Sequence, residues 1–331
     1  MGKKRNSKAI YQSFGSNLLF LSIIIFPLLL DLPHSKGEIT LDSSKSSQTA
    51  MKLSMIPAQY GEVIYRFNEK SPNQIFIIGM SHMDSLSCLN GENTSRVQAE
   101  VYKIGDWLIH NQNLELLLPE GFFTSKTGKM EKENLKALER KRSCGELDFK
   151  VLEEKLSDNK TYVNAEMLLN DYHQLWMRQV ENKGLYDAAR DSLVKLLNCR
   201  EGPSQYSIMK SGVDYLQERR AAAMLQKIPE IIEAEFRQGN IKNRKAIFTI
   251  GISHLHNIIR YQNEKRIRIY APLTASNGSE DYLSELNLLK DNFGVSIILP
   301  RTLLNDQKIL KINRLDKIIP PSSKLSYLSS P

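Results

Sequence analysis

The chain has 331 residues, of which 41% are hydrophobic and 25% charged, with 17 Gly and 12 Pro. This composition excludes collagen-like, low-complexity and wholly disordered proteins, and the length suits one large domain or two small ones. Its three cysteines are too few for a disulfide scaffold or a four-thiolate zinc site. The net charge of +8 would suit a nucleic-acid-binding protein, but its distribution argues otherwise.

The N-terminus resembles a secretory signal. Residues 1–16 contain four basic residues and no acid, and a 13-residue apolar run follows over 18–30. That run is shorter than the roughly 20 residues of a membrane-spanning helix. We expect residues 1–37 to be a signal peptide cleaved after Gly37, with an uncleaved signal anchor as the alternative. The protein is then exported to the periplasm or extracellular space, and it meets a membrane only through residues 18–30 if the anchor is kept.

Export has consequences for charge and for the cysteines. Residues 1–37 contain five basic residues and one acid, so the remainder carries +4. It has no stripe of Lys and Arg interleaved with aromatics, and nucleic acid is not an expected partner. An oxidising compartment would allow a disulfide between Cys144 and Cys199, with Cys88 unpaired. The alternative is that all three cysteines are reduced.

Hydrophobic periodicity predicts alternating strands and helices after a flexible Ser/Thr/Lys-rich linker at 38–55. The predicted elements are a strand at 61–67, a strand at 74–79, a helix at 94–110, a strand at 114–118, helices at 129–142, 163–180 and 205–237 (one long helix or a pair, broken near Pro229), a strand at 246–251, a helix after 254, a strand at 266–270, a helix at 279–291 and a strand at 294–299. This order predicts an α/β domain over 56–300 with a largely parallel sheet. A helical insertion over about 126–240 would cap one edge of the sheet. Residues 301–331 are expected to be a basic, Pro/Ser-rich tail.

Two segments of the chain repeat each other. Residues 75–82 (IFIIGMSH) and 247–254 (IFTIGISH) are identical at six of eight positions. Each is an apolar run that ends in Gly-x-Ser-His, which predicts two pseudo-symmetric halves of one sheet. His82 and His254 would then lie just past the carboxyl ends of strands, where open α/β sheets bind ligands.

A carboxylate follows a third apolar run in the same way, since Glu120 ends the sequence LELLLPE. Two histidines and a carboxylate are a common ligand set for a divalent metal, and a histidine can also act as the base that activates water. Asp84 could orient His82, whereas His256 is a weaker candidate because residues two apart do not share a helix face. The alternatives are a strand-end histidine that stabilises a turn and a capping carboxylate.

The paired motifs Gly79–His82 and Gly251–His254, together with Glu120 and the segment QERRAAAM (217–224), resemble the TraB/PrgY, Tiki and GumN family, which belongs to a wider set with ChaN and the erythromycin esterases. The resemblance covers roughly residues 56–300 and implies an α/β fold with pseudo-symmetric halves. It also implies a metal-dependent, peptidase-like site built from His82, His254, Glu120 and the arginine Arg219. Arg220 follows where family members often have Asn or Asp, so either arginine could point inward.

These observations predict an exported hydrolase that uses Mn, Co or Zn to cleave an amide or ester bond in a peptide or small substrate. Glu120 and Arg219 would be catalytic, with Arg219 stabilising the charge that develops on a carbonyl oxygen. A metal-free esterase with one histidine as base is a second hypothesis. A third is a binding or regulatory module without turnover, such as a haem-binding protein with Tyr162, Tyr172 or Tyr215 as ligand.

Overall fold

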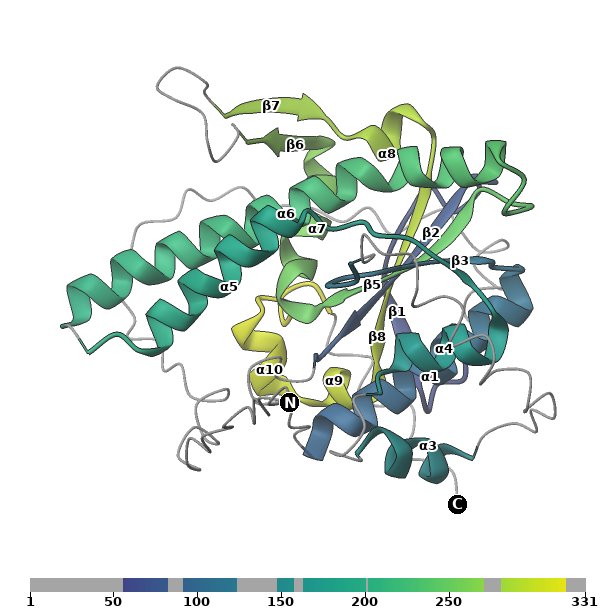
Figure 1. Cartoon of the computed structure of the whole chain (residues 1–331), viewed down its shortest axis with the longest axis horizontal. Coiled ribbons are helices and arrows are strands. Elements are labelled where there is room, and N and C mark those ends of the chain that lie inside the picture. Colours follow the sequence, from purple (N-terminus) through teal and green to yellow (C-terminus); the bar gives the residue numbers. More distant parts are fainter. Residues whose placement is uncertain are drawn as a thin grey trace, which may run out of the picture. The chain divides into compact units, whose positions relative to one another are not determined.

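A six-stranded sheet forms the centre of the fold, in the order β1-β8-β2-β5-β3-β4 (Figure 1). Its strands are β1 (Gly61–Phe67), β2 (Gln74–Met80), β3 (Leu116–Pro119), β4 (Trp176–Met177), β5 (Lys245–Gly251) and β8 (Gly294–Pro300). β1 runs antiparallel to β8, and the other pairs are parallel. The structure, a computed structural model, describes residues 56–82, 92–123, 148–157, 163–200, 202–270 and 281–319. It confirms an α/β fold with a largely parallel sheet.

The central strands are continuously apolar because helices cover both faces of the sheet. Every residue of β2 and of β8 is buried. Helix α1 (Glu92–Gln112) connects β2 to β3, and α7 (Leu255–Glu264) begins the connection from β5 to β8. These two crossovers run in opposite directions along the sheet. Right-handed connections therefore place α1 and α7 on opposite faces.

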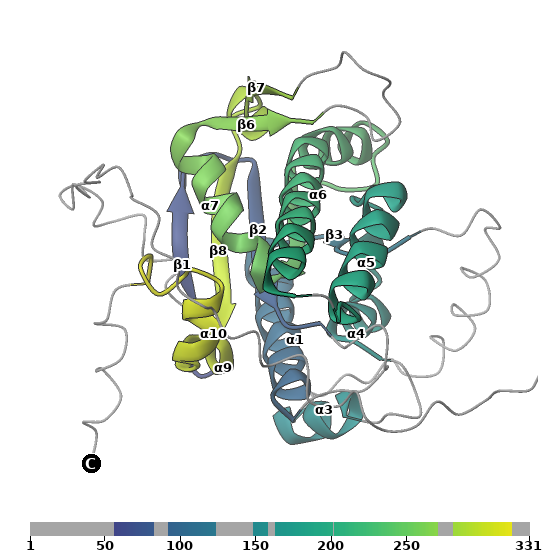
Figure 2. The same cartoon turned by 90° about the vertical axis from the view of Figure 1, so that its left-hand side faces the viewer.

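The long connection from β3 to β5 is mostly helical, as predicted. It contains α3 (Phe149–Leu156), α4 (Ala165–His173), α5 (Lys183–Leu197) and α6 (Pro203–Arg237). The side chains of Asp148, Asn164 and Asn182 cap the first turns of α3, α4 and α5. Figures 1 and 2 show α5 and α6 lying side by side.

Two details of this connection differ from the prediction. The helix expected over 163–180 ends at His173, and Trp176–Met177 instead form strand β4 beside β3. The helix expected to break near Pro229 continues through it as the single helix α6, in which Pro229 is buried. A proline removes one backbone hydrogen bond, and the packing of this long helix compensates for that loss. The helix predicted at 129–142 lies outside the described residues.

The C-terminal part differs more. The helix predicted at 279–291 is wrong, since β7 (Tyr282–Glu285) pairs antiparallel with β6 (Arg266–Ile269), and only the short α8 (Asn287–Lys290) is helical. The tail predicted from residue 301 is wrong up to residue 319. It begins with α9 (Arg301–Asn305) and α10 (Gln307–Ile312), and Leu315 beyond them is fully buried.

The signal segment 1–37 and the linker 38–55 lie outside the described residues, as do Asp84, Cys88, Cys144 and Tyr162. Within the described ranges, no helix is long and apolar enough to cross a membrane.

Gly79, the glycine of the first repeated motif, is required by close packing. A Cβ atom at this position would lie 2.4 Å from Leu255 Cδ1 and 2.8 Å from Leu299 Cδ2, and both leucines are fully buried. We expect Gly79→Ala to lower the free energy of unfolding by about 1–3 kcal/mol, because the core must repack. Gly212→Ala, on an open face of α6, is the control and should stabilise by up to about 1 kcal/mol. Urea denaturation measures both, and equal effects would contradict the packing argument.

Candidate active site

Three adjacent parallel strands bring the predicted residues together. β5 lies between β2 and β3, so His82, His254 and Glu120 follow neighbouring strand ends at one edge of the sheet. The backbone N–H of Glu120 donates to the Thr249 carbonyl at 3.0 Å, which fixes the exit of β3 beside β5. Segments far apart in the sequence therefore meet at this edge.

The Glu120 carboxylate is the centre of the site and receives four contacts. His82 Nε2 lies 3.0 Å from Oε2, and the backbone N–H of Gly251 donates to the same oxygen at 2.6 Å. Arg220 Nη2 donates to Oε1 at 2.7 Å, and His254 Nε2 lies 3.2 Å from that oxygen. A carboxylate has about four acceptor positions, so protein groups occupy all of them. Because an ionised carboxylate only accepts, both histidines present Nε2–H to it.

The charges around Glu120 favour its ionised form. Burial alone would raise its pKa, but His254 and His82 beside it hold the pKa well below the usual range. Ionised Glu120 therefore stabilises the fold at neutral pH, and this contribution is lost only as the pH falls through the lowered pKa. Burial tends to lower the pKa of His82, but the charge of Glu120, the hydrogen bond to it and the charge of Glu166 together outweigh burial and raise that pKa.

The two motif histidines differ in access to solvent. The His82 side chain is 40% exposed, whereas that of His254 is 2% exposed. Nδ1 of His254 is buried without a hydrogen-bond partner. His82 is thus the histidine that a substrate or water can reach, and His254 forms the inner wall of the site.

The arginine at the site is Arg220, which corrects the expectation for Arg219. Arg220 donates through Nη2 to Glu120, through Nε to Glu181, and through Nη1 to Gln217 Oε1 at 2.7 Å. The neighbouring residue on α6, Arg219, places its guanidinium 5.8 Å from the centre of the Tyr270 ring. Three N–H groups of Arg220 donate to side chains of the protein, and one of these bonds anchors the Glu120 carboxylate.

Two acids at the site were missed by the sequence analysis. Glu181, four residues after β4, accepts from Arg220 and from the backbone N–H of Gly121 at 2.9 Å. Glu166 on α4 accepts from Thr249 Oγ1 at 3.0 Å, while its other oxygen is buried without a partner. Burial raises the pKa of Glu166. Glu120 was identified because it is a polar residue that follows a strand. Glu181 also follows a strand, so recognising β4 in the sequence would have pointed to it.

The surrounding backbone supports the same edge. Gln98 on α1 donates to the Ser81 carbonyl at 2.8 Å and accepts from the backbone N–H of Ala165 at 2.8 Å. A Cβ on Gly251 would lie 3.1 Å from His82 Nε2 and 3.3 Å from Glu120 Oε2. The second motif glycine is thus needed at the site itself.

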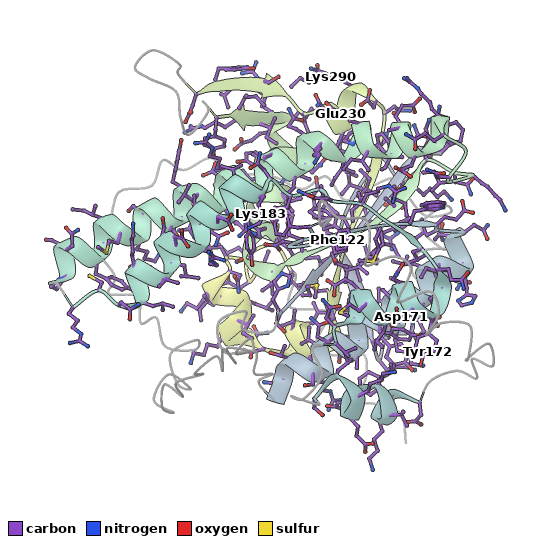
Figure 3. All side chains as sticks on the ribbon, in the orientation of Figure 1. Phe122, Asp171, Tyr172, Lys183, Glu230 and Lys290 are labelled. Atoms are coloured by element: carbon purple, nitrogen blue, oxygen red, sulfur yellow. The ribbon has the colours of Figure 1, made fainter. Side chains whose placement is uncertain are left out.

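A loop and a helix flank the site. The loop after β3, with Phe122, lies near the start of α5, with Lys183 (Figure 3). The ring of Phe123 packs edge-on against Tyr186, and Lys183 Nζ lies 5.3 Å from the centre of the Phe123 ring. The helical connection therefore reaches the edge of the sheet that carries Glu120.

Other candidates lie elsewhere. His256 is near Arg314 and Arg260, and its pKa is lowered by burial and by these charges. Tyr172 packs edge-on against Tyr102, and Tyr215 against Tyr270. None of these contacts joins the Glu120 cluster.

His82, His254 and Glu120 are the side chains that could hold a metal ion at this site. Two imidazoles and a carboxylate are suitable ligand types. In this geometry, however, protein N–H groups occupy the acceptor positions of the Glu120 carboxylate, and two of those N–H groups belong to the histidines themselves. Metal binding through Nε2 would require Arg220 or Gly251 to release an oxygen and both imidazoles to move the Nε2 proton to Nδ1. The arrangement does not fit a metal without that rearrangement.

Comparisons with family models, with curated proteins and with solved structures find no match for this chain.

The coupling of His82 to Glu120 can be measured. We expect the pKa of His82 to fall in Glu120→Gln, because the negative charge that raises it is removed while the burial that lowers it remains. NMR titration of the imidazole protons measures this. Glu115→Gln is the matched control, since Glu115 precedes β3 and accepts from the Lys242 backbone N–H. An unchanged His82 pKa in Glu120→Gln would contradict the pairing.

Proposed function

We propose that this chain is a hydrolase of amide or ester bonds, with His82 as the general base and Glu120 as the residue that orients it. The single observation that carries the proposal is the buried Glu120 carboxylate that holds the Nε2 side of an exposed histidine. This is the arrangement by which a carboxylate fixes a histidine tautomer and stabilises the imidazolium formed during acyl transfer. The resemblance of the paired Gly-x-x-His motifs to the TraB/Tiki/GumN family supports the same reaction class.

The reaction follows from the tautomer. With Nε2–H directed at Glu120, Nδ1 is the His82 nitrogen left to accept a proton from water. The water oxygen bonds to the substrate carbonyl carbon as its proton passes to Nδ1, and His82 then returns the proton to the departing amine or alcohol as the bond to it breaks. Glu120 stays ionised and stabilises the positive imidazolium. Because the base must be neutral, the rate should rise with pH through the raised pKa of His82.

Arg220 and Gly251 donate to Glu120 and keep it in place, and Glu181 in turn accepts from Arg220. A buried carboxylate that lost the two donors would become protonated or turn away. His254 closes the inner side of the site with a second N–H on the same carboxylate. In this proposal these groups position the acid–base pair and do not meet the substrate.

A metal-dependent version, with Mn, Co or Zn held by His82, His254 and Glu120, would supply a Lewis acid and an activated water. It requires the rearrangement of the Glu120 donors described above, so we favour the metal-free version. Elemental analysis and chelation separate the two. If the protein hydrolyses no substrate, a ligand- or haem-binding module without turnover becomes the favoured function.

We test hydrolysis with the full chain on libraries of p-nitrophenyl esters and fluorogenic peptides. His82→Asn should reduce turnover by about 10²–10⁴-fold, the range of a general base, and Glu120→Gln should shift the rising limb of the pH–rate profile to lower pH. His256→Asn, two residues from the second motif histidine but outside the cluster, should retain activity. Turnover that persists in His82→Asn would overturn the proposed base, and absence of turnover on every substrate would favour the binding module.

The same samples decide between the two versions. Activity that survives dialysis against a chelator supports the metal-free reaction. Activity lost on chelation and restored by Mn, Co or Zn, with an ion lost from His254→Asn, would establish the metal-dependent version. A Soret band in the absorption spectrum would instead support haem.

A further inference from the structure

A second cluster of titratable side chains lies away from Glu120, where the C-terminal ends of α1 and α4 meet. It consists of Asp106 and His110 on α1 and His173 on α4. Asp106 Oδ1 lies 2.9 Å from His173 Nε2 and 3.4 Å from His110 Nδ1. In the part of the chain that the structure describes, this is the group of His, Cys, Asp and Glu residues whose ligand atoms all lie within 4.8 Å of one another.

Close helix packing creates the cluster. Leu169 of α4 packs against Gly105 of α1, where a Cβ would lie 2.5 Å from Leu169 Cδ1. One turn from Asp106, the centre of the Tyr102 ring lies 6.0 Å from that of Tyr172, which Figure 3 labels on α4. The helices therefore approach closely at the residues that precede the three polar side chains.

Neighbouring side chains favour the ionised form of Asp106. Partial burial opposes the ionisation of Asp106, but His173, His110 and Lys103 together lower its pKa. His173 Nε2 is buried, and although it lies near Asp106 it lacks the alignment of a hydrogen bond. His110 is 65% exposed, and its Nδ1 lies 2.8 Å from the Asp106 carbonyl. The His110 ring packs edge-on against the His173 ring, with ring centres 5.2 Å apart. Its exposed side lets it exchange its tautomer through solvent.

The spacing fits a small transition-metal ion. Bonds of about 2.0 Å in a tetrahedron place ligand atoms about 3.3 Å apart. The two measured distances from Asp106 Oδ1 bracket that value. Both histidines also lie in the last turns of their helices, where the carbonyl ends of the helix dipole favour a cation.

We propose that Asp106, His110 and His173 bind one divalent transition-metal ion, with Zn²⁺ as the best match to two imidazoles and one carboxylate. The ion links α1 to α4 at the ends opposite those that support the candidate active site. Gln98 of α1 contacts Ser81 and the start of α4 at that other end. The ion is thus structural, and it stabilises the helix pair without taking part in hydrolysis.

The test is Zn²⁺ binding to the full chain by equilibrium dialysis and calorimetry. His110→Gln should weaken binding by at least about 10-fold, and because this side chain is exposed the variant should fold normally. Asn111→Ala, an exposed neighbour on α1, is the matched control and should bind as the wild type does. The double variant Asp106→Asn, His173→Gln should lose one equivalent of Zn²⁺.

A second pair of measurements separates this site from the candidate active site. The double variant His82→Asn, His254→Asn should keep the Zn²⁺ equivalent, and Cu²⁺ bound to it should show electron paramagnetic resonance couplings from two imidazoles. Zn²⁺ should also raise the melting temperature of the wild type but not of His110→Gln. Unchanged Zn²⁺ affinity in His110→Gln would overturn the proposal, as would loss of all Zn²⁺ from the His82→Asn, His254→Asn variant alone. Asp106 would then only form an ion pair with the two histidines.

Discussion

The buried carboxylate of Glu120 imposes the strictest constraint on this fold. An ionised carboxylate out of contact with water is costly unless donors surround it. Here the donors come from β2, β5 and α6, so the order of the strands, the exit of β5 and the rotation of α6 must all be right at once. Glu181 extends the requirement to β4, because it holds the arginine that holds Glu120. The site and the sheet edge therefore form one cooperative unit.

Much of this arrangement could be predicted from local pattern. Apolar runs that end in Gly-x-Ser-His predicted β2 and β5, and the polar residue after a third run predicted that Glu120 would join the two histidines. The choice between Arg219 and Arg220 could not be predicted. Successive residues on a helix point about 100° apart, and both arginines are buried in α6, so burial gives no sign of which one faces the sheet. Only the packed position of the helix decides it.

The larger errors arose where pairing is not local. Strand β4 has two residues and follows a helix, so the amphipathic pattern of 163–180 concealed it, and Glu181 with it. Residues 282–285 form a strand because β6 pairs with them across a separate stretch of chain. Leu310 and Leu315 appear isolated in a basic segment, yet the core has room for them. In each case a tertiary contact, absent from the local pattern, determined the structure.

The repeated motif is symmetric in sequence and asymmetric in structure. Gly79 is required by leucines in the core, whereas Gly251 is required because His82 and Glu120 lie against it. His82 emerges at a partly exposed position, while the equivalent His254 is enclosed. One carboxylate, Glu120, therefore contacts both histidines of the repeat, and only one of the two faces solvent.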